Sequence, residues 1–259
     1  MEGRQDERER LRAQRQAAES QDAASLHARK RRVQFLTIGA FAAVAVIVAL
    51  IVISQSGGSS SSSPPASVTG AAQVNSELSG IPQSGQVMGQ SSAPVTVIEY
   101  GDPQCSSCKF FSENVAPQLI SSQVKTGKAK YEFRPFLIIG PDSKPAMKAA
   151  LAAGEQNRFW QFLQLFYINQ GGENSGYVTD SFLTGLAKGA GVPDIGKWNQ
   201  SRDDPKWDAV IQQGSSQANS FGFTGTPSIV VQGPKGQKAL GGGSIPTLQQ
   251  IEAAIQQVG

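Results

Sequence analysis

The stretch APVTVIEYGDPQCSSCKFF, residues 93–111, contains both cysteines of this 259-residue chain. Its first eight residues are mainly apolar and β-branched, which predicts a short buried strand. The turn GDPQ comes next, and then Phe111, Val115 and Leu119 recur at the spacing of one helix face. Cys105 is therefore expected where a strand and a turn give way to a helix, with Cys108 one turn further along.

The rest of the C-terminal part alternates between strand and helix patterns. Further strands are predicted at 128–136, 227–233 and 237–242. Helices are predicted at 145–169, with a break near Gly154, and at 180–188, 205–219 and 245–258. The order is strand, helix, strand, several helices, strand, strand, helix. This order predicts an α/β domain over residues 78–259, with a helical insert at roughly 142–220.

Residues 33–53, VQFLTIGAFAAVAVIVALIVI, carry no charged side chain. As a helix this segment would be about 31 Å long, enough for a hydrocarbon core of about 30 Å. A cleavable signal peptide would have a shorter apolar region and a small-residue cleavage pattern, which the following SQSGGSS does not offer. A buried core helix is rarely so uniformly apolar. We therefore expect an uncleaved transmembrane helix embedded in the lipid bilayer.

The charges around this segment predict its orientation. Residues 1–32 form a charged segment with nine Lys or Arg and six acidic residues, whereas the first basic residue after the apolar run is Lys109. The positive-inside rule then puts the N-terminus in the cytoplasm and everything after Ile53 outside the cell membrane, beginning with a Ser/Gly/Pro-rich linker at 54–77. Beyond residue 32 the chain has 14 basic and 14 acidic residues, so no nucleic-acid partner is expected.

The cysteine pair is open to three uses: a metal site, a static disulfide or a redox couple. A zinc site needs three or four ligands, and the single histidine, His27, falls on the other side of the predicted membrane, so no metal is expected. A static disulfide closing about four residues would add roughly 2 kcal/mol, little for a domain of this size. A redox couple fits better, because free N–H groups at the start of a helix stabilise a thiolate at Cys105, and Cys108 lies on the same helix face.

The stretch at 93–111, together with FGFTGTPSIVVQG at 221–233, resembles the DsbA-like thiol:disulfide oxidoreductases. This is a thioredoxin-fold family with an inserted helical domain, and the resemblance spans residues 78–259. It implies that Cys105 is the nucleophile, that Cys108 is the resolving thiol, and that no cofactor is used. It also implies a cis-proline loop at Thr226 and Pro227 that offers backbone groups to an extended substrate. A trans proline that merely begins the next strand is the alternative.

Other residues near the pair are read through the same resemblance. Glu99 occupies the place of an acidic residue beneath the active site in many relatives, which implies a proton relay to Cys108. A solvated glutamate at a strand end is the alternative. Asp102 is expected to be a turn residue. Ser106 and Ser107 stand where many relatives have Pro and an aromatic residue or His, which predicts a less perturbed Cys105 and a milder oxidant.

These observations predict a membrane-tethered, extracytoplasmic thiol–disulfide oxidoreductase that oxidises the thiols of exported proteins. The resemblance also implies a quinone-linked membrane partner that reoxidises it. Two alternatives stay open. One is a reductase or isomerase that uses the same couple, and the other is a non-catalytic thioredoxin-fold interaction domain with a static disulfide.

Overall fold

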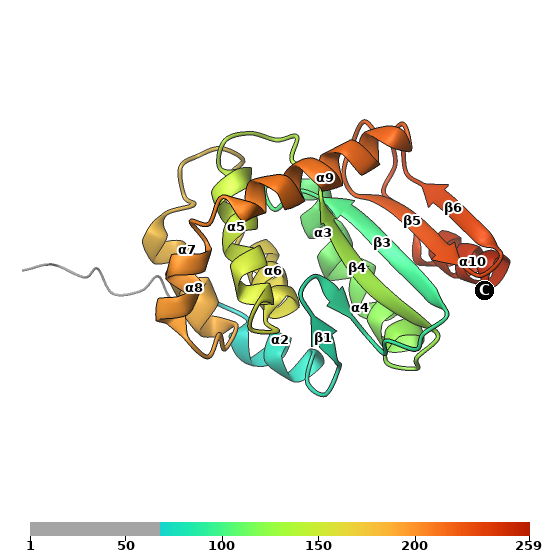
Figure 1. Ribbon diagram of the computed structural model, residues 1–259, viewed down its shortest axis with the longest axis horizontal. Coiled ribbons are helices and arrows are strands. Elements are labelled where there is room, and N and C mark those ends of the chain that lie inside the picture. The colour runs from blue at the N-terminus through green and yellow to red at the C-terminus, as the bar shows by residue number, and fades with distance from the viewer. Residues whose placement is uncertain (1–67) are drawn as a thin grey trace, which may run out of the picture. The chain divides into compact units, whose positions relative to one another are not determined.

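The computed structural model describes residues 68–259 (Figure 1). The predicted charged segment at 1–32, the predicted transmembrane helix at 33–53 and linker residues 54–67 lie outside this described part. Within residues 68–259, no helix is both long and apolar enough to cross a membrane.

A six-stranded sheet in the order β1-β2-β4-β3-β5-β6 forms the centre of the described part. Its strands are β1 (Gln83–Ser84), β2 (Val87–Met88), β3 (Val95–Gly101), β4 (Ala129–Pro135), β5 (Ser228–Gly233) and β6 (Gly236–Leu240). β3 and β4 run parallel, and the other neighbours run antiparallel. The four strands predicted from the sequence are confirmed. The β1–β2 hairpin was not predicted, because two-residue strands are too short to show a periodic pattern.

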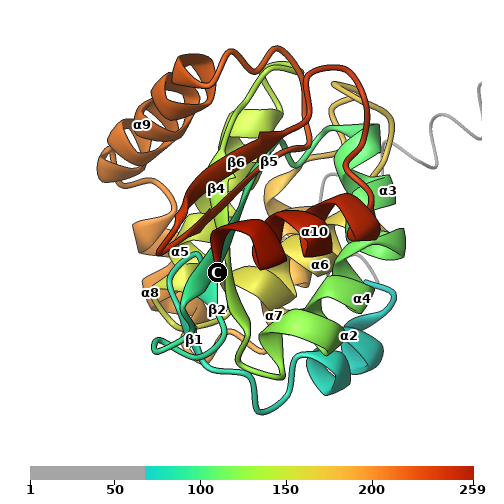
Figure 2. The same ribbon diagram turned by 90° about the vertical axis from the view of Figure 1, so that its right-hand side faces the viewer.

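Helices cover both faces of this sheet. They are α2 (Ala71–Glu77), α3 (Ser106–Asn114), α4 (Ala116–Leu119), η1 (Ile120–Val124), α5 (Ser143–Gly154), α6 (Phe159–Ile168), α7 (Asp180–Gly189), α8 (Ile195–Ser201), α9 (Lys206–Ser220) and α10 (Leu248–Val258). α3, α4 and α10 lie on one face, and α9 lies on the other (Figure 2). Because β3 and β4 are parallel, they need a crossover, and α3, α4 and η1 form it.

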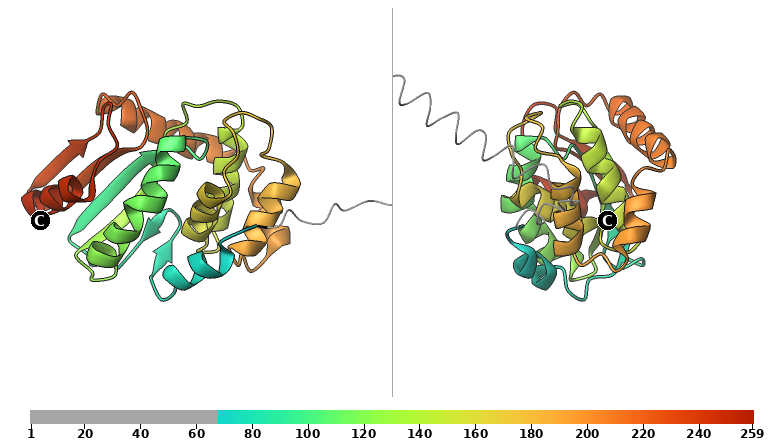
Figure 3. Two further views of the ribbon diagram at one scale, coloured as in Figure 1. Left: turned by 180° about the vertical axis from the view of Figure 1, so that it is seen from behind. Right: turned by 90° about the vertical axis from the view of Figure 1, so that its left-hand side faces the viewer.

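The predicted helical insert is confirmed as α5 to α9. Seen from behind in Figure 3, α5 to α8 gather beside the sheet, on the side of β4 away from β5. α6 is buried over almost its whole length, so its aromatic residues hold the insert against the sheet. α8 was not predicted; its sequence IGKWNQS is largely polar, and only Trp198 is buried.

The predicted linker end at residue 77 is wrong. Residues Ala71–Glu77 form α2, in which Val74 is 1% exposed and packs in the main core. Asn75 Nδ2 donates to Gly189 O at 2.8 Å, which ties this helix to the insert. A helix of seven small and polar residues is marginal by itself, so its contacts with the rest of the domain stabilise it. The small and polar composition of this segment therefore led to the prediction that it belongs to the linker.

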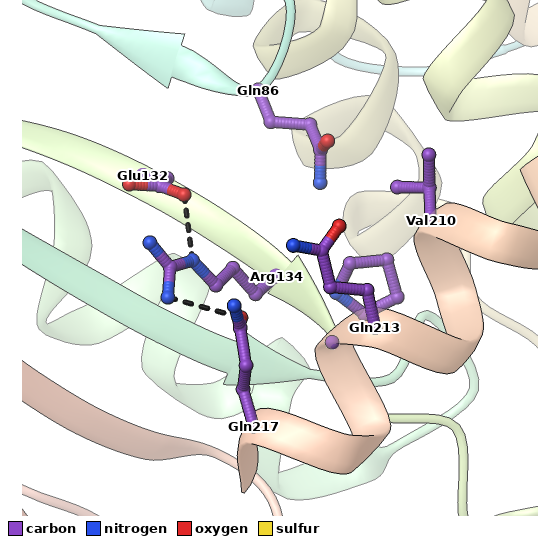
Figure 4. Close-up of a pocket in the computed structure, with 8 residues that line it drawn as sticks. Gln86, Glu132, Arg134, Val210, Gln213 and Gln217 are labelled. Atoms are coloured by element: carbon purple, nitrogen blue, oxygen red, sulfur yellow. Dashed lines mark hydrogen bonds and ion pairs between the residues drawn. The ribbon is translucent and has the colours of Figure 1, made fainter.

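α9 approaches the sheet closely at Gly214, where an added Cβ would lie 2.2 Å from Pro135 O. A polar cavity of about 120 Å³ lies beside this contact (Figure 4). In it, Arg134 donates to Glu132 Oε1 at 2.7 Å and to Gln217 Oε1 at 3.0 Å. Both Arg134 donors are thus used within the protein, and the bond to Gln217 fastens α9 to β4.

Candidate active site

Cys105 is the N-cap residue of α3, directly after the turn that follows β3. The backbone N–H of Cys108 donates to Cys105 Sγ at 3.3 Å, so the first free N–H groups of the helix point at this sulfur. Both cysteines are free thiols. Cys105 is 5% exposed and Cys108 is 0% exposed, so Cys105 is the sulfur nearer to solvent.

The two thiols differ strongly in acidity. A hydrogen bond from the Cys108 thiol lowers the pKa of Cys105 to about 6, with burial opposing this shift and the contact with Thr226 and backbone N–H groups assisting it. Burial, and then the bond to Cys105, raise the pKa of Cys108 well above its ordinary value. At neutral pH Cys105 is therefore the thiolate and Cys108 holds the proton. A thiolate is the form of cysteine that attacks a disulfide.

The loop before β5 lies beside Cys105. The peptide bond between Thr226 and Pro227 is cis, so the alternative of a trans proline is wrong. Cys105 Sγ contacts Thr226 O at 3.4 Å. Ser228 Oγ donates to Gly225 O at 2.8 Å and holds the loop from its far end. The structure thus brings together four of the residues selected from the sequence, although 121 positions separate Cys105 from Thr226.

Glu99 lies under α3 and is only 3% exposed, so the alternative of a solvated glutamate is wrong. The Tyr131 hydroxyl donates to Glu99 Oε2. Burial raises the pKa of Glu99 to about 7, Tyr131 opposes this rise, and the nearby Cys105 charge adds to it. Because the charge on Glu99 in turn raises the pKa of Cys108, the carboxyl and the inner thiol are electrostatically coupled.

Tyr131 was missed in the sequence. Alternation along β4 indicates which of its residues share a face, but it does not say which of them meets Glu99. That pairing depends on the parallel register, which sets Val97 opposite Tyr131 and Glu99 opposite Phe133.

Asp102 does more than form a turn. It is fully buried, and its two carboxylate oxygens accept three backbone N–H groups. Oδ1 accepts from Gln104 at 2.9 Å, and Oδ2 accepts from Ile138 at 2.9 Å and Ile139 at 3.0 Å. Asp102 therefore fixes the turn before Cys105 to the loop after β4. The sequence offered no sign of this link, because the two partners in the loop after β4, Ile138 and Ile139, lie more than 30 positions away.

The insert also supports the active-site turn. From the segment after α6, Gln170 Nε2 donates to Pro103 O at 2.7 Å, and the N–H of Asn174 donates to Gln104 Oε1 at 2.9 Å. On α3 itself, Lys109 Nζ donates to Tyr167 O at 2.6 Å, at the end of α6. The cysteine pair is thus held between the sheet and the insert.

The chain has a cysteine pair at the start of a helix, a cis-proline loop beside it, and a mixed sheet with a helical insert. Together these features define a thioredoxin fold with a helical insert. Residues 83–254 match the family model described as thioredoxin, and the chain belongs to this family. The match includes both cysteines and Pro227.

Individual relatives match this chain over most of their own length. Disulfide bond formation protein D of Bacillus subtilis is 28% identical over 163 residues, covering 61% of this chain and 73% of the relative. The oxidised form of BdbD from Bacillus subtilis superposes with a TM-score of 0.58 at 24% identity, covering 66% of this chain and 91% of that one. Wolbachia pipientis alpha-DsbA1 superposes with a TM-score of 0.52 at 24% identity, covering 67% of this chain and 89% of that one. The two solved structures have the same fold as this chain.

Proposed function

We propose that this chain is a thiol:disulfide oxidoreductase that oxidises pairs of thiols in exported proteins through Cys105 and Cys108. The observation that carries the proposal is the separation in acidity between the two thiols, with the pKa of Cys105 at about 6 and that of Cys108 well above its ordinary value. Each unit by which the pKa of Cys105 falls favours the reduced couple by about 1.4 kcal/mol. The corresponding disulfide is then a better oxidant.

The exchange begins with the Cys105–Cys108 disulfide. A substrate thiolate attacks Cys105 Sγ, a substrate–Cys105 disulfide forms, and the Cys105–Cys108 bond breaks with Cys108 leaving as a thiolate. A second substrate thiolate then attacks the substrate sulfur of this mixed disulfide and releases Cys105 as a thiolate. Two electrons pass from the substrate thiols to the couple. One proton ends on Cys108, and the other goes to solvent.

Glu99 serves as the proton donor to Cys108 in this scheme. The leaving Cys108 is buried and strongly basic, so it needs a proton from a nearby group rather than from bulk water. A carboxyl whose pKa is raised to about 7 still holds a proton near neutral pH. When the couple is reoxidised, the same carboxylate takes the proton back.

The cis-proline loop is proposed as the docking site for an extended substrate segment, with backbone groups near Thr226 and Pro227 pairing with it. The contact between Cys105 Sγ and Thr226 O supports this role, since a substrate bound there lies beside the attacked sulfur. In this form of peptide binding, an extended segment of the substrate pairs with exposed backbone groups as an added strand would.

The charge-free run at 33–53 supports a membrane tether, with residues 78–259 outside the cytoplasm. A quinone-linked membrane partner, which the family resemblance implies, would reoxidise the couple. Tethering would keep the domain at a high effective concentration near that partner. Protease treatment of intact cells tests this arrangement: the C-terminal domain should be cleaved without lysis, and a protected domain would contradict it.

A titration of the full chain against glutathione tests the oxidant assignment. We expect a reduction potential well above that of thioredoxin, which is about −270 mV. A value at or below that of thioredoxin would favour the reductase reading. In cells, Cys108→Ser should accumulate mixed disulfides on Cys105, and Cys105→Ser serves as the matched control. If neither variant traps adducts, a non-catalytic interaction domain becomes the better reading.

A further inference from the structure

Tyr131 stands out as a buried titratable group that the exchange scheme above does not use. It lies on β4 and is 1% exposed. Its ring rests on Trp160 of α6, with a centroid separation of 4.4 Å and an interplanar angle of 32°. Its hydroxyl donates to Glu99 Oε2. A buried phenol needs a hydrogen-bond partner, and here the partner is the carboxyl proposed to handle the proton.

The second oxygen of Glu99 is in a different situation. Oε1 is buried and has no hydrogen-bond partner among residues 68–259. A neutral carboxyl group has one O–H donor and one acceptor oxygen. Because the Tyr131 hydroxyl donates to Oε2, that oxygen is the acceptor, and the proton of the neutral acid resides on Oε1.

The other polar groups around this carboxyl do not compete for the same oxygen. Cys105 and Cys108, at the start of α3, interact with it through charge: in addition to burial, the charge on Cys105 raises the pKa of Glu99, and the charge on Glu99 raises the pKa of Cys108. Burial, and with it the charge of Glu99, also raises the pKa of Tyr167 on α6, but the Tyr167 hydroxyl donates to Asp102 O at 3.4 Å.

The nearest lysine along α3 is also directed elsewhere. Lys109 Nζ forms an ion pair with Glu113 at 2.5 Å and bonds to the end of α6. Among residues 68–259, the hydrogen-bond donor to Glu99 Oε2 is therefore the uncharged Tyr131 hydroxyl.

We propose that Tyr131 is a positioning residue for proton exchange between Glu99 and Cys108: its hydroxyl holds Oε2, so the proton moves through Oε1. This inference rests on the proton relay in the proposed function. In that step the O–H bond at Oε1 breaks, an S–H bond forms on the Cys108 thiolate, and no electron is transferred. The carboxylate left behind keeps its hydrogen bond from Tyr131, which stabilises the charge inside the core.

The titration behaviour of the pair agrees with this geometry. Burial raises the pKa of Glu99, and the bond from Tyr131 is the contribution that opposes it. Burial, with the nearby charge of Glu99, raises the pKa of Tyr131 itself well above its ordinary value, so the phenol stays a donor throughout the physiological range. Tyr131 therefore keeps Glu99 acidic enough to release its proton near neutral pH.

The test is carboxyl ¹³C NMR of the reduced full chain in detergent, labelled at glutamate. The Glu99 signal is identified as the one lost in Glu99→Gln. Tyr131→Phe removes only the hydroxyl and keeps the ring on Trp160. We expect it to move the Glu99 midpoint to higher pH by about one unit or more, since a hydrogen bond to a charged group is lost. An unchanged midpoint would overturn the proposal.

Tyr167→Phe is the matched control, because it removes a second buried hydroxyl that does not contact Glu99. We expect its midpoint to stay within a few tenths of a unit of the wild type, and an equal shift in both variants would contradict a specific role for Tyr131. If Tyr131→Phe does not fold, uniform replacement of tyrosine by 3-fluorotyrosine keeps the shape and makes the donor stronger. The midpoint should then fall, and a rise or no change would overturn the proposal.

A separate measurement isolates the proposed relay. The rate of exchange with a reduced peptide should lose its inflection near pH 7 in Glu99→Gln. If the inflection persists in that variant, Glu99 is not the relay and the proposed function fails at this point. The NMR midpoint in Tyr131→Phe is read without any rate, so the two failures are distinguishable.

Discussion

Glu99 and Glu132 lie on neighbouring strands and on opposite faces of one sheet. Glu99 points under α3, is nearly fully buried and receives a hydrogen bond from a neutral phenol. Glu132 points under α9, keeps about a fifth of its side chain exposed and forms an ion pair with Arg134 at 2.7 Å. The parallel register places them one position apart, with Ile98 opposite Glu132 and Glu99 opposite Phe133.

The difference shows how a partner determines what a carboxyl group can do. A guanidinium remains charged and donates in several fixed directions, so Arg134 pairs with Glu132 on its own strand and also binds Gln217 of α9, which holds that helix in place. A phenol stabilises a carboxylate only weakly by comparison, so burial dominates and Glu99 retains its proton up to about pH 7. One face of the sheet is thus suited to proton transfer, and the other to anchoring.

Removing the sulfur that substrate thiolates attack should have the largest effect on the α3 face of the sheet. Cys105→Ser should reduce disulfide exchange with a reduced peptide to the uncatalysed rate, because serine cannot form a disulfide with Cys108 or with the substrate. Arg134→Met, on the other face, should retain most of the exchange rate. Stopped-flow fluorescence with the full chain would measure both, and comparable losses in the two variants would contradict the division between the faces.

The second largest effect should be a pH dependence of the free energy of unfolding that originates at Glu99. The pKa of folded Glu99 is about 7, against an ordinary value of 4.5, so the unfolded chain releases this proton first as the pH rises. The free energy of unfolding should therefore fall from about pH 4.5 to about pH 7, by at most about 3 kcal/mol from this group. Glu99→Gln should be more stable than the wild type at pH 8 and similar near pH 4.5, as measured by urea unfolding of the reduced chain. Equal stability at both pH values would argue against a protonated Glu99.

A smaller effect should show which hydrogen-bond donors on the α3 face set the pKa of Cys105. Its rate of alkylation should be half-maximal near pH 6, because a hydrogen bond from the Cys108 thiol and further donors stabilise the thiolate. Cys108→Ala removes the main donor and should raise this midpoint by about one unit or more. Cys108→Ser keeps a hydroxyl donor and should raise it less. Identical midpoints in the two variants would show that the bond from Cys108 does not control this pKa.

The smallest effect is expected from the ion pair on the α9 face. Arg134→Met should lower the free energy of unfolding by about 1 kcal/mol or less, because the pair is partly exposed and its charges are screened. It should leave the alkylation midpoint of Cys105 unchanged. A shift of that midpoint would mean that the two faces are electrostatically coupled, and the comparison would need revision.

Much of the fold was predictable because its signals are local. The strand at 93–100 and the helices of the insert other than α8 follow from short periodic patterns in the sequence. The two marginal elements, α2 and the β1–β2 hairpin, escaped prediction because contacts with distant segments stabilise them. Asp102 escaped for the same reason, since its N–H partners at Ile138 and Ile139 belong to a loop beyond the next strand.

The sequence by itself determined the cysteine pair, its place at the start of a helix and the proline of the facing loop. These features depend on residues within one helical turn or one loop. Only the tertiary structure decided that Glu99 is buried, that Tyr131 meets it and that Thr226 lies beside Cys105. Strand register and the crossover between β3 and β4 set those contacts. Proton affinity depends on burial and on the neighbours that folding supplies.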